Sequence, residues 1–77
     1  DIHSKAKMIV AEICKNTDFS VKNILVHHYG KNRIYITIYM VTTEQNKNNI
    51  FPVQHLIKSR LEDELNCSSA VNWEVIS

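Results

Sequence analysis

The alternation along residues 33–41 constrains the fold more than any other feature of this chain. Apolar side chains alternate there with aromatic and hydroxyl ones: Ile34, Ile36, Ile38 and Met40 against Tyr35, Thr37 and Tyr39. A period of two is the period of a β-strand with one buried face. We therefore expect a strand over residues 33–41, with the first set in the core and the second set on the opposite face.

A second strand is expected immediately before this one. Residues 21–29 are largely β-branched, aliphatic or aromatic, which favours extended structure. Gly30, Lys31 and Asn32 then supply the residues of a tight reversal. The two strands are predicted to form a hairpin.

Two amphipathic helices flank the hairpin. Between residues 2 and 15 the apolar positions recur at intervals of three and four: Ile2, Ala6, Ile9, Val10 and Ile13. Residues 42–49 contain no apolar side chain, so we expect a solvated loop that ends in an N-cap at Asn48 or Asn49. The second helix follows, with Pro52 in its first turn and an apolar stripe. That stripe comprises Val53, Leu56, Ile57, Leu61 and Leu65.

A third strand closes the chain after Asn66. Residues 70–76 alternate Val71, Trp73 and Val75 against Asn72, Glu74 and Ile76. The order is αββαβ, and we expect one α+β domain over residues 1–77: a two-layer sandwich with a three-stranded mixed sheet and both helices on one face.

The other face of this sheet stays open in such a fold and would carry Tyr35, Thr37, Tyr39 and Glu74. Two tyrosines on an uncovered sheet indicate an interface. The alternative is that the rings lie flat on the surface with their hydroxyl groups in water.

Composition narrows the class of function. The chain has 9 Lys and Arg against 8 Asp and Glu, a net charge of +1, so it lacks the basic excess of a nucleic-acid-binding surface. Cys14 and Cys67 are too few and too far apart for a disulfide framework and indicate reduced thiols of a cytosolic protein. No set of residues indicates a catalytic site, and one glycine cannot build a phosphate loop. We therefore expect no enzyme.

The adjacent histidines His27 and His28 raise the question of a metal site. Neighbouring residues on a strand point to opposite faces, so this pair is a weak chelator, and the hairpin explains it more simply. His55 falls away from the apolar stripe of the second helix and is expected to be exposed. It could share a weak surface site with Glu62 or Glu74, although no spacing supports one.

The segments VKNILVHHYGKNRIYITIYM, IFPVQHLIKSRLEDEL and AVNWEVI, in this order, resemble the cytoplasmic C-terminal domain of cation diffusion facilitator transporters. The resemblance covers nearly the whole chain. It implies a metallochaperone-like, ferredoxin-like sheet attached to a membrane part that exchanges protons for divalent cations such as zinc, iron or manganese. The chain begins at Asp1 without an initiator methionine, and we expect a domain excised from a longer membrane protein.

The resemblance also implies ligands, although several are replaced. Lys22 stands where the family has a metal-binding histidine on the first strand, and Thr37 stands where a histidine can occur on the second. His55 matches the histidine that begins the second helix, and Glu74 stands at the closing histidine of the third strand. The candidate ligands for zinc or iron are thus His55 and Glu74, with His27 or His28, and Lys22 puts the site in doubt because it repels a cation.

The sequence therefore leads to two hypotheses. The first is a non-enzymatic cytosolic dimerisation and regulatory domain of a divalent metal efflux transporter. It would form a homodimer through Tyr35, Thr37 and Tyr39 and touch the membrane only through the rest of its own chain. The alternative is a small RNA- or ribosome-associated domain of the KH-like kind, for which the sequence lacks both a basic groove and a GxxG loop.

Overall fold

The computed structural model describes residues 1–77 and confirms the αββαβ order. The elements are α1 (Ile2–Cys14), β1 (Ser20–His28), β2 (Ile34–Thr43), α2 (Ile50–Leu65) and β3 (Ser68–Ile76), with a short 3-10 helix, η1 (Glu44–Asn49), before α2. Each helix and strand lies within two or three residues of its predicted position.

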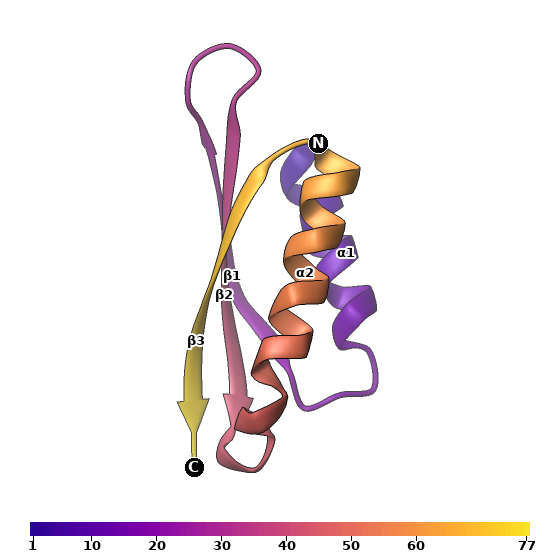
Figure 1. Cartoon of the computed structure of the whole chain (residues 1–77), viewed down its shortest axis with the longest axis vertical. Helices are drawn as coiled ribbons and strands as arrows, with labels where there is room; N and C mark the ends of the chain where they lie inside the picture. The colour runs from indigo at the N-terminus through magenta and orange to yellow at the C-terminus, as the bar shows by residue number, and fades with distance from the viewer.

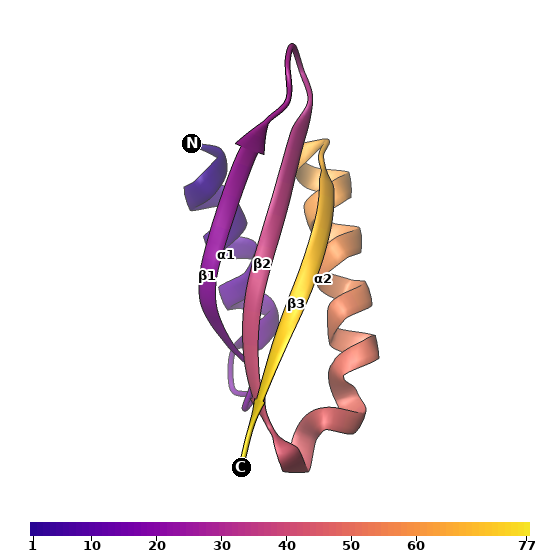
Figure 2. The same ribbon diagram turned by 90° about the vertical axis from the view of Figure 1, so that its left-hand side faces the viewer.

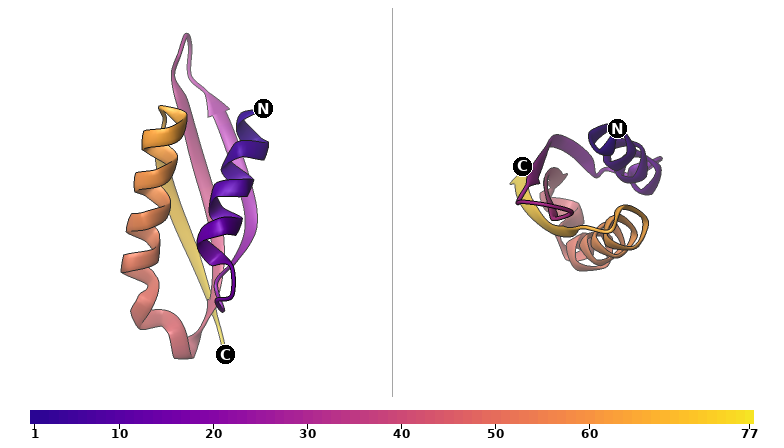
Figure 3. Two further views of the ribbon diagram at one scale, coloured as in Figure 1. Left: turned by 90° about the vertical axis from the view of Figure 1, so that its right-hand side faces the viewer. Right: turned by 90° about the horizontal axis from the view of Figure 1, so that it is seen from above.

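The sheet has the order β1-β2-β3, with β2 in the centre. β1 pairs with β2 in antiparallel fashion through the hairpin, and β3 pairs with β2 in parallel after the α2 crossover, so the sheet is mixed as expected. Both helices lie on one side of it (Figure 1), and the views along the other directions show the opposite face without any covering element (Figures 2 and 3). The expected two-layer α+β fold is confirmed.

The core lies between these two layers. Its buried apolar side chains come from α1, β1, β2 and α2 and from Phe19, which precedes β1: Ala6, Ile9, Val10, Phe19, Ile24, Ile36, Ile38, Met40, Ile57 and Leu61. Ile36, Ile38 and Met40 are almost completely buried, whereas Tyr35, Thr37 and Tyr39 between them are only half-buried. The period of two in β2 therefore separates the core face from the open face as predicted.

The hairpin forms where the sequence placed it. Gly30 has a φ of 69° and Asn32 a φ of 63°, and both glycine and asparagine tolerate this left-handed conformation. The Tyr29 N–H donates to the carbonyl oxygen of Arg33 at 2.8 Å and closes the turn. Asn66 has a φ of 51° and ends α2 in the same left-handed region.

Two expectations were wrong. The predicted loop at 42–49 begins later, because Thr42 and Thr43 continue β2 by pairing with Val75 and Ile76 of β3, and residues 44–49 then form η1. Leu56 was assigned to the apolar stripe of α2 but is 47% exposed. It lies about 100° around the helix from Ile57, which faces the core, and this rotation places Leu56 at the solvent border of the buried stripe.

Candidate interaction surface

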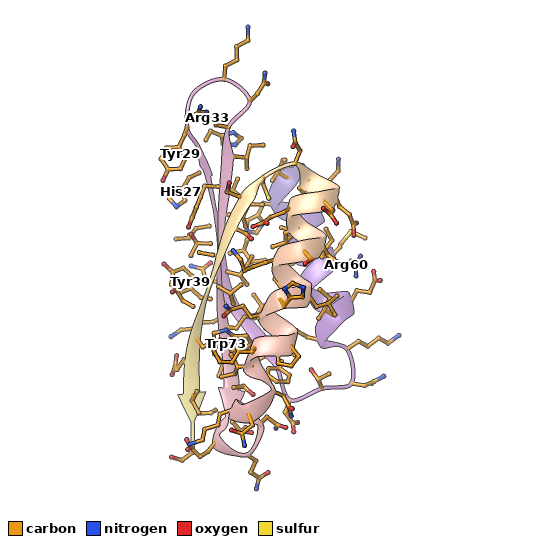
Figure 4. The ribbon with its side chains drawn as sticks, in the orientation of Figure 1. His27, Tyr29, Arg33, Tyr39, Arg60 and Trp73 are labelled. Atoms are coloured by element: carbon orange, nitrogen blue, oxygen red, sulfur yellow. The ribbon has the colours of Figure 1, made fainter.

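The open face of the sheet carries the three residues that the sequence proposed as an interface. Tyr35, Thr37 and Tyr39 lie along the middle of this face, on β2. The register places further side chains on the same face in rows across the strands: Asn23, Leu25 and His27 from β1, and Ala70, Asn72, Glu74 and Ile76 from β3. Figure 4 shows His27, Tyr29 and Tyr39 projecting on this side, away from both helices. The face mixes aromatic, aliphatic and amide groups and carries little charge.

Aromatic rings gather at the hairpin end of this face. The rings of His27 and Tyr29 stack with centroids 6.1 Å apart, and Tyr29 meets Tyr35 edge to face at 6.3 Å. Beside them lies a shallow groove of about 430 Å³, whose lining includes Tyr29, Arg33 and Tyr35. Tyr29 remains 58% exposed, so this cluster is available for contact.

An ion pair crosses the other end of the open face. The register of β1 skips Lys22 in a β-bulge between Val21 and Asn23, and the Lys22 ammonium lies 3.0 Å from a carboxylate oxygen of Glu74. Lys22 therefore joins β1 to β3 across β2. Two residues that stand in ligand positions by resemblance are bonded to each other instead.

The proposed metal ligands lie on different surfaces of the chain. His27 is on the open face, opposite Tyr35, whereas His28 is opposite Ile34 and so points to the helix side. His55 is exposed on α2, in the other layer from Glu74. Within the chain no group of three or more histidine, cysteine or acidic side chains lies close enough together to hold a metal ion. The structure does not bring the four candidates together in one protomer.

A polar contact that the sequence does not predict joins α2 to β3. Glu62 accepts hydrogen bonds from the Ser69 N–H at 3.1 Å and from the Ser69 hydroxyl at 2.8 Å. Lys58 contacts both the Glu62 carboxylate and the Ser69 carbonyl oxygen. The hydroxyl group of Ser69 and then the Lys58 ammonium hold the pKa of the Glu62 carboxyl below its ordinary value, although partial burial opposes them.

We call these three residues, Lys58, Glu62 and Ser69, the α2–β3 clasp. Lys58 and Glu62 form an i,i+4 ion pair along α2, at 3.4 Å. No local signal identifies Ser69 as the third member, because its position depends on how β3 packs beside α2. The clasp fixes the beginning of β3 against the helix.

Trp73 anchors the middle of β3 on the core side. Its indole N–H donates to the side-chain oxygen of Gln54 at 2.8 Å, and its ring meets Phe19 edge to face at 5.6 Å. Figure 4 shows Trp73 between the sheet and α2. Its side chain is therefore a structural element and not part of the open face.

Both cysteines are free, as expected, and are partly buried. Burial raises the pKa of the Cys14 thiol. Burial also raises the pKa of the Cys67 thiol, and the nearby negative charge of Glu62 raises it further. A raised pKa lowers the thiolate fraction at neutral pH, so neither side chain is tuned as a nucleophile.

The chain was compared with protein-family models, with curated proteins and with solved structures, and none of them matches. None of the helices has both the length and the apolar character needed to span a membrane.

Proposed function

We propose that this chain is a non-enzymatic dimerisation and regulatory domain, on the cytoplasmic side, of a divalent metal cation transporter. The observation that carries the dimerisation is the open sheet face, with Tyr35 and Tyr39 half-buried on it and no element of the chain covering it. Tyrosine is enriched in the cores of protein interfaces because its ring buries apolar area while its hydroxyl group keeps a polar partner. The assignment to a transporter is supported by the resemblance in sequence pattern and by the αββαβ fold.

A second copy of the chain is the occupant that the charge of this face favours. The only fixed charges of its three strands are Lys22 and Glu74, which neutralise each other at 3.0 Å. Two such faces can approach without net repulsion, whereas an acidic or basic partner gains no long-range attraction from this surface.

The size of the face sets the strength of the contact. Three strands about 4.8 Å apart, each about nine residues of roughly 3.3 Å, give a footprint of roughly 400 Å² per protomer. Two such footprints amount to roughly 800 Å², which is below the ~1,200 Å² of stable complexes. The dimer of the isolated chain is therefore weak and depends on concentration.

A weak contact suits a regulatory role. A domain that dimerises only partly on its own can shift between associated and separated states for a modest free energy, provided that a ligand binds the two states differently. In a transporter this equilibrium would bias the arrangement of the membrane part.

The test is sedimentation velocity of the chain over a concentration series, with and without equimolar zinc. We expect a reversible monomer–dimer equilibrium. Thr37→Lys, which places one ammonium per protomer at the centre of the face, should weaken it by at least roughly tenfold through like-charge repulsion. Met8→Lys is the matched control, because Met8 is 71% exposed on α1 and lies in the helix layer.

The outcomes separate the parts of the proposal. A dimer that zinc strengthens supports both dimerisation and regulation by metal. A dimer indifferent to zinc leaves the dimerisation and removes metal as its regulator. A monomer at every concentration, or a dimer that Thr37→Lys leaves unchanged, refutes the open face as the interface, and specific RNA binding by such a monomer would point to the KH-like alternative.

A further inference from the structure

The two edges of the sheet are protected differently. β1, at one edge, carries a bulge at Lys22, and bulges and lysines are devices that keep further strands from adding to a sheet. β3, at the other edge, runs for nine residues, Ser68–Ile76, with no proline and no bulge against β2. Its single charged residue, Glu74, is turned to the open face and paired with Lys22. The β3 edge is therefore the one open to strand addition.

The α2–β3 clasp shows which backbone groups of β3 point outward. The Ser69 N–H donates to Glu62 and the Ser69 carbonyl oxygen accepts from Lys58, so both groups point away from β2 and towards α2 side chains. The backbone direction alternates along a strand, so the N–H and C=O groups of Val71, Trp73 and Val75 point outward in the same way. Outside the pairing of the strands themselves, no backbone hydrogen bond of the chain involves these groups.

Apolar side chains border the same stretch of edge. On α2, Phe51 lies seven residues before Lys58, which places both side chains within about 20° of each other around the helix. Lys58 reaches β3, and Phe51 on the same flank is 80% exposed. Val75, on the helix side of β3, is 39% exposed. Figure 2 shows α2 running alongside β3 on its outer side.

We propose that the β3 edge, between the strand and the Phe51 flank of α2, binds an extended peptide segment of another protein as a fourth strand. Unpaired N–H and C=O groups of three alternate residues match the backbone of an extended strand, which exchanges hydrogen bonds with Val71, Trp73 and Val75. Apolar side chains at alternate positions of the peptide pack beneath Phe51 and against Val75. This contact is separate from the dimer face and goes beyond the function proposed above.

The position of α2 selects a peptide over a second copy of the chain. Each α2 lies on the outer side of its own β3. If the β3 strands of two copies paired around a two-fold axis, both α2 helices would therefore have to occupy the space beside the same pair of strands. A bare strand brings no helix and leaves that space free.

The probe is the synthetic peptide acetyl-Lys-Val-Thr-Val-Thr-Val-Lys-amide, titrated into the ¹⁵N-labelled chain and followed by amide chemical shifts. We expect saturable shifts at the amides of Val71, Trp73 and Val75, together with slower hydrogen exchange there. The Ser69 amide is already bonded to Glu62 and serves as an internal reference that changes little.

Two substitutions at one position isolate the backbone contact. Val75→Pro removes an outward N–H that has no partner in the free chain, so the fold is retained while peptide affinity falls roughly tenfold. Val75→Ala keeps this N–H and should weaken binding by a smaller factor. Phe51→Ala removes the flanking ring and also lowers affinity, and the fold is retained because the Phe51 side chain is 80% exposed.

Three results would overturn the proposal: no shifts up to millimolar peptide, shifts confined to Tyr35, Thr37 and Tyr39, or equal affinity of the Val75→Pro and wild-type chains. Protection of the Val71–Val75 amides that rises with chain concentration alone would replace the peptide by a second copy. The dimer proposal is tested by a different measurement, the sedimentation velocity of the wild-type chain and of Thr37→Lys without peptide. The two proposals can therefore fail independently.

Discussion

Glu62→Gln tests whether the α2–β3 clasp stabilises the fold. Glu62 accepts two hydrogen bonds from Ser69, whose side chain is almost completely buried, and lies 3.4 Å from Lys58. A hydrogen bond to a charged group contributes about 1.5–3 kcal/mol. The Glu62 side chain is 39% exposed, so water screens part of this, and glutamine retains one acceptor oxygen. We therefore expect a loss of about 1–2 kcal/mol in the free energy of unfolding.

Urea denaturation at pH 7 measures this loss, and thermal unfolding should show a Tm lower by roughly 5–10 °C. Glu64→Gln is the matched control, because it removes a charge from the same helix where the carboxylate, 48% exposed, pairs with Arg60 at 2.9 Å. This exposed pair should be worth less than about 1 kcal/mol. Equal losses for the two variants, or no loss for Glu62→Gln, would refute the clasp as a specific stabilising contact.

The clasp also predicts a pH dependence whose sign follows from the lowered pKa of Glu62. The folded-state pKa lies below the ordinary value of 4.5, so the folded chain holds this carboxylate ionised more readily than the unfolded chain does. The resulting stability is fully present above the ordinary value and is lost as the pH falls through the lowered folded value. The difference between the wild-type chain and Glu62→Gln should therefore shrink as the pH falls below the ordinary value. A difference that stays constant down to acid unfolding would contradict this assignment.

Four further substitutions probe the core and the hairpin by the same urea assay. Leu61→Ala, at a completely buried position, should lower the free energy of unfolding by about 2–5 kcal/mol. Leu56→Ala should lower it by less than about 1 kcal/mol, because Leu56 is 47% exposed. Similar losses for the two variants would contradict the assignment of Leu61, and not Leu56, to the buried side of α2. Thr42→Val should be neutral or stabilise by up to about 1 kcal/mol, because the buried Thr42 hydroxyl has no hydrogen-bond partner, and a clear loss would show that this hydroxyl is satisfied. Gly30→Ala should cost about 1 kcal/mol through backbone strain alone, since no atom lies within 4 Å of the added methyl group; no change would show that the turn relaxes freely.

Periodicity predicted most of the fold because burial dominates it. The alternation in β2 identified both faces of the sheet, and the three- and four-residue spacing in the helices identified the faces that meet Ile36 and Ile38. These patterns record which side of an element faces the core, and for a small αββαβ chain that is nearly sufficient to arrange the layers.

Contacts that depend on tertiary register were not predictable in the same way. Lys22 and Glu74 lie 52 residues apart in the sequence and meet only because a bulge in β1 and the parallel register of β3 place them on one face. The link between Glu62 and Ser69 similarly depends on the path of β3 beside α2. Leu56 was misplaced because the stripe on α2 is narrow, and a hydrophobic residue at its border can face either side.

The positions of the candidate ligands determine how metal and dimerisation can be connected. His27 and Glu74 share the open face, but their partners on β2, Tyr35 and Val41, are six residues apart, or about 20 Å along the strand. His55 lies in the other layer. One protomer therefore cannot place two of these three side chains on the same ion, whereas a two-fold arrangement of antiparallel faces would bring His27 of one protomer towards Glu74 of the other. An ion held in this way binds the dimer and not the monomer, so it strengthens association by its whole binding free energy, and the zinc-dependent sedimentation experiment measures that linkage directly.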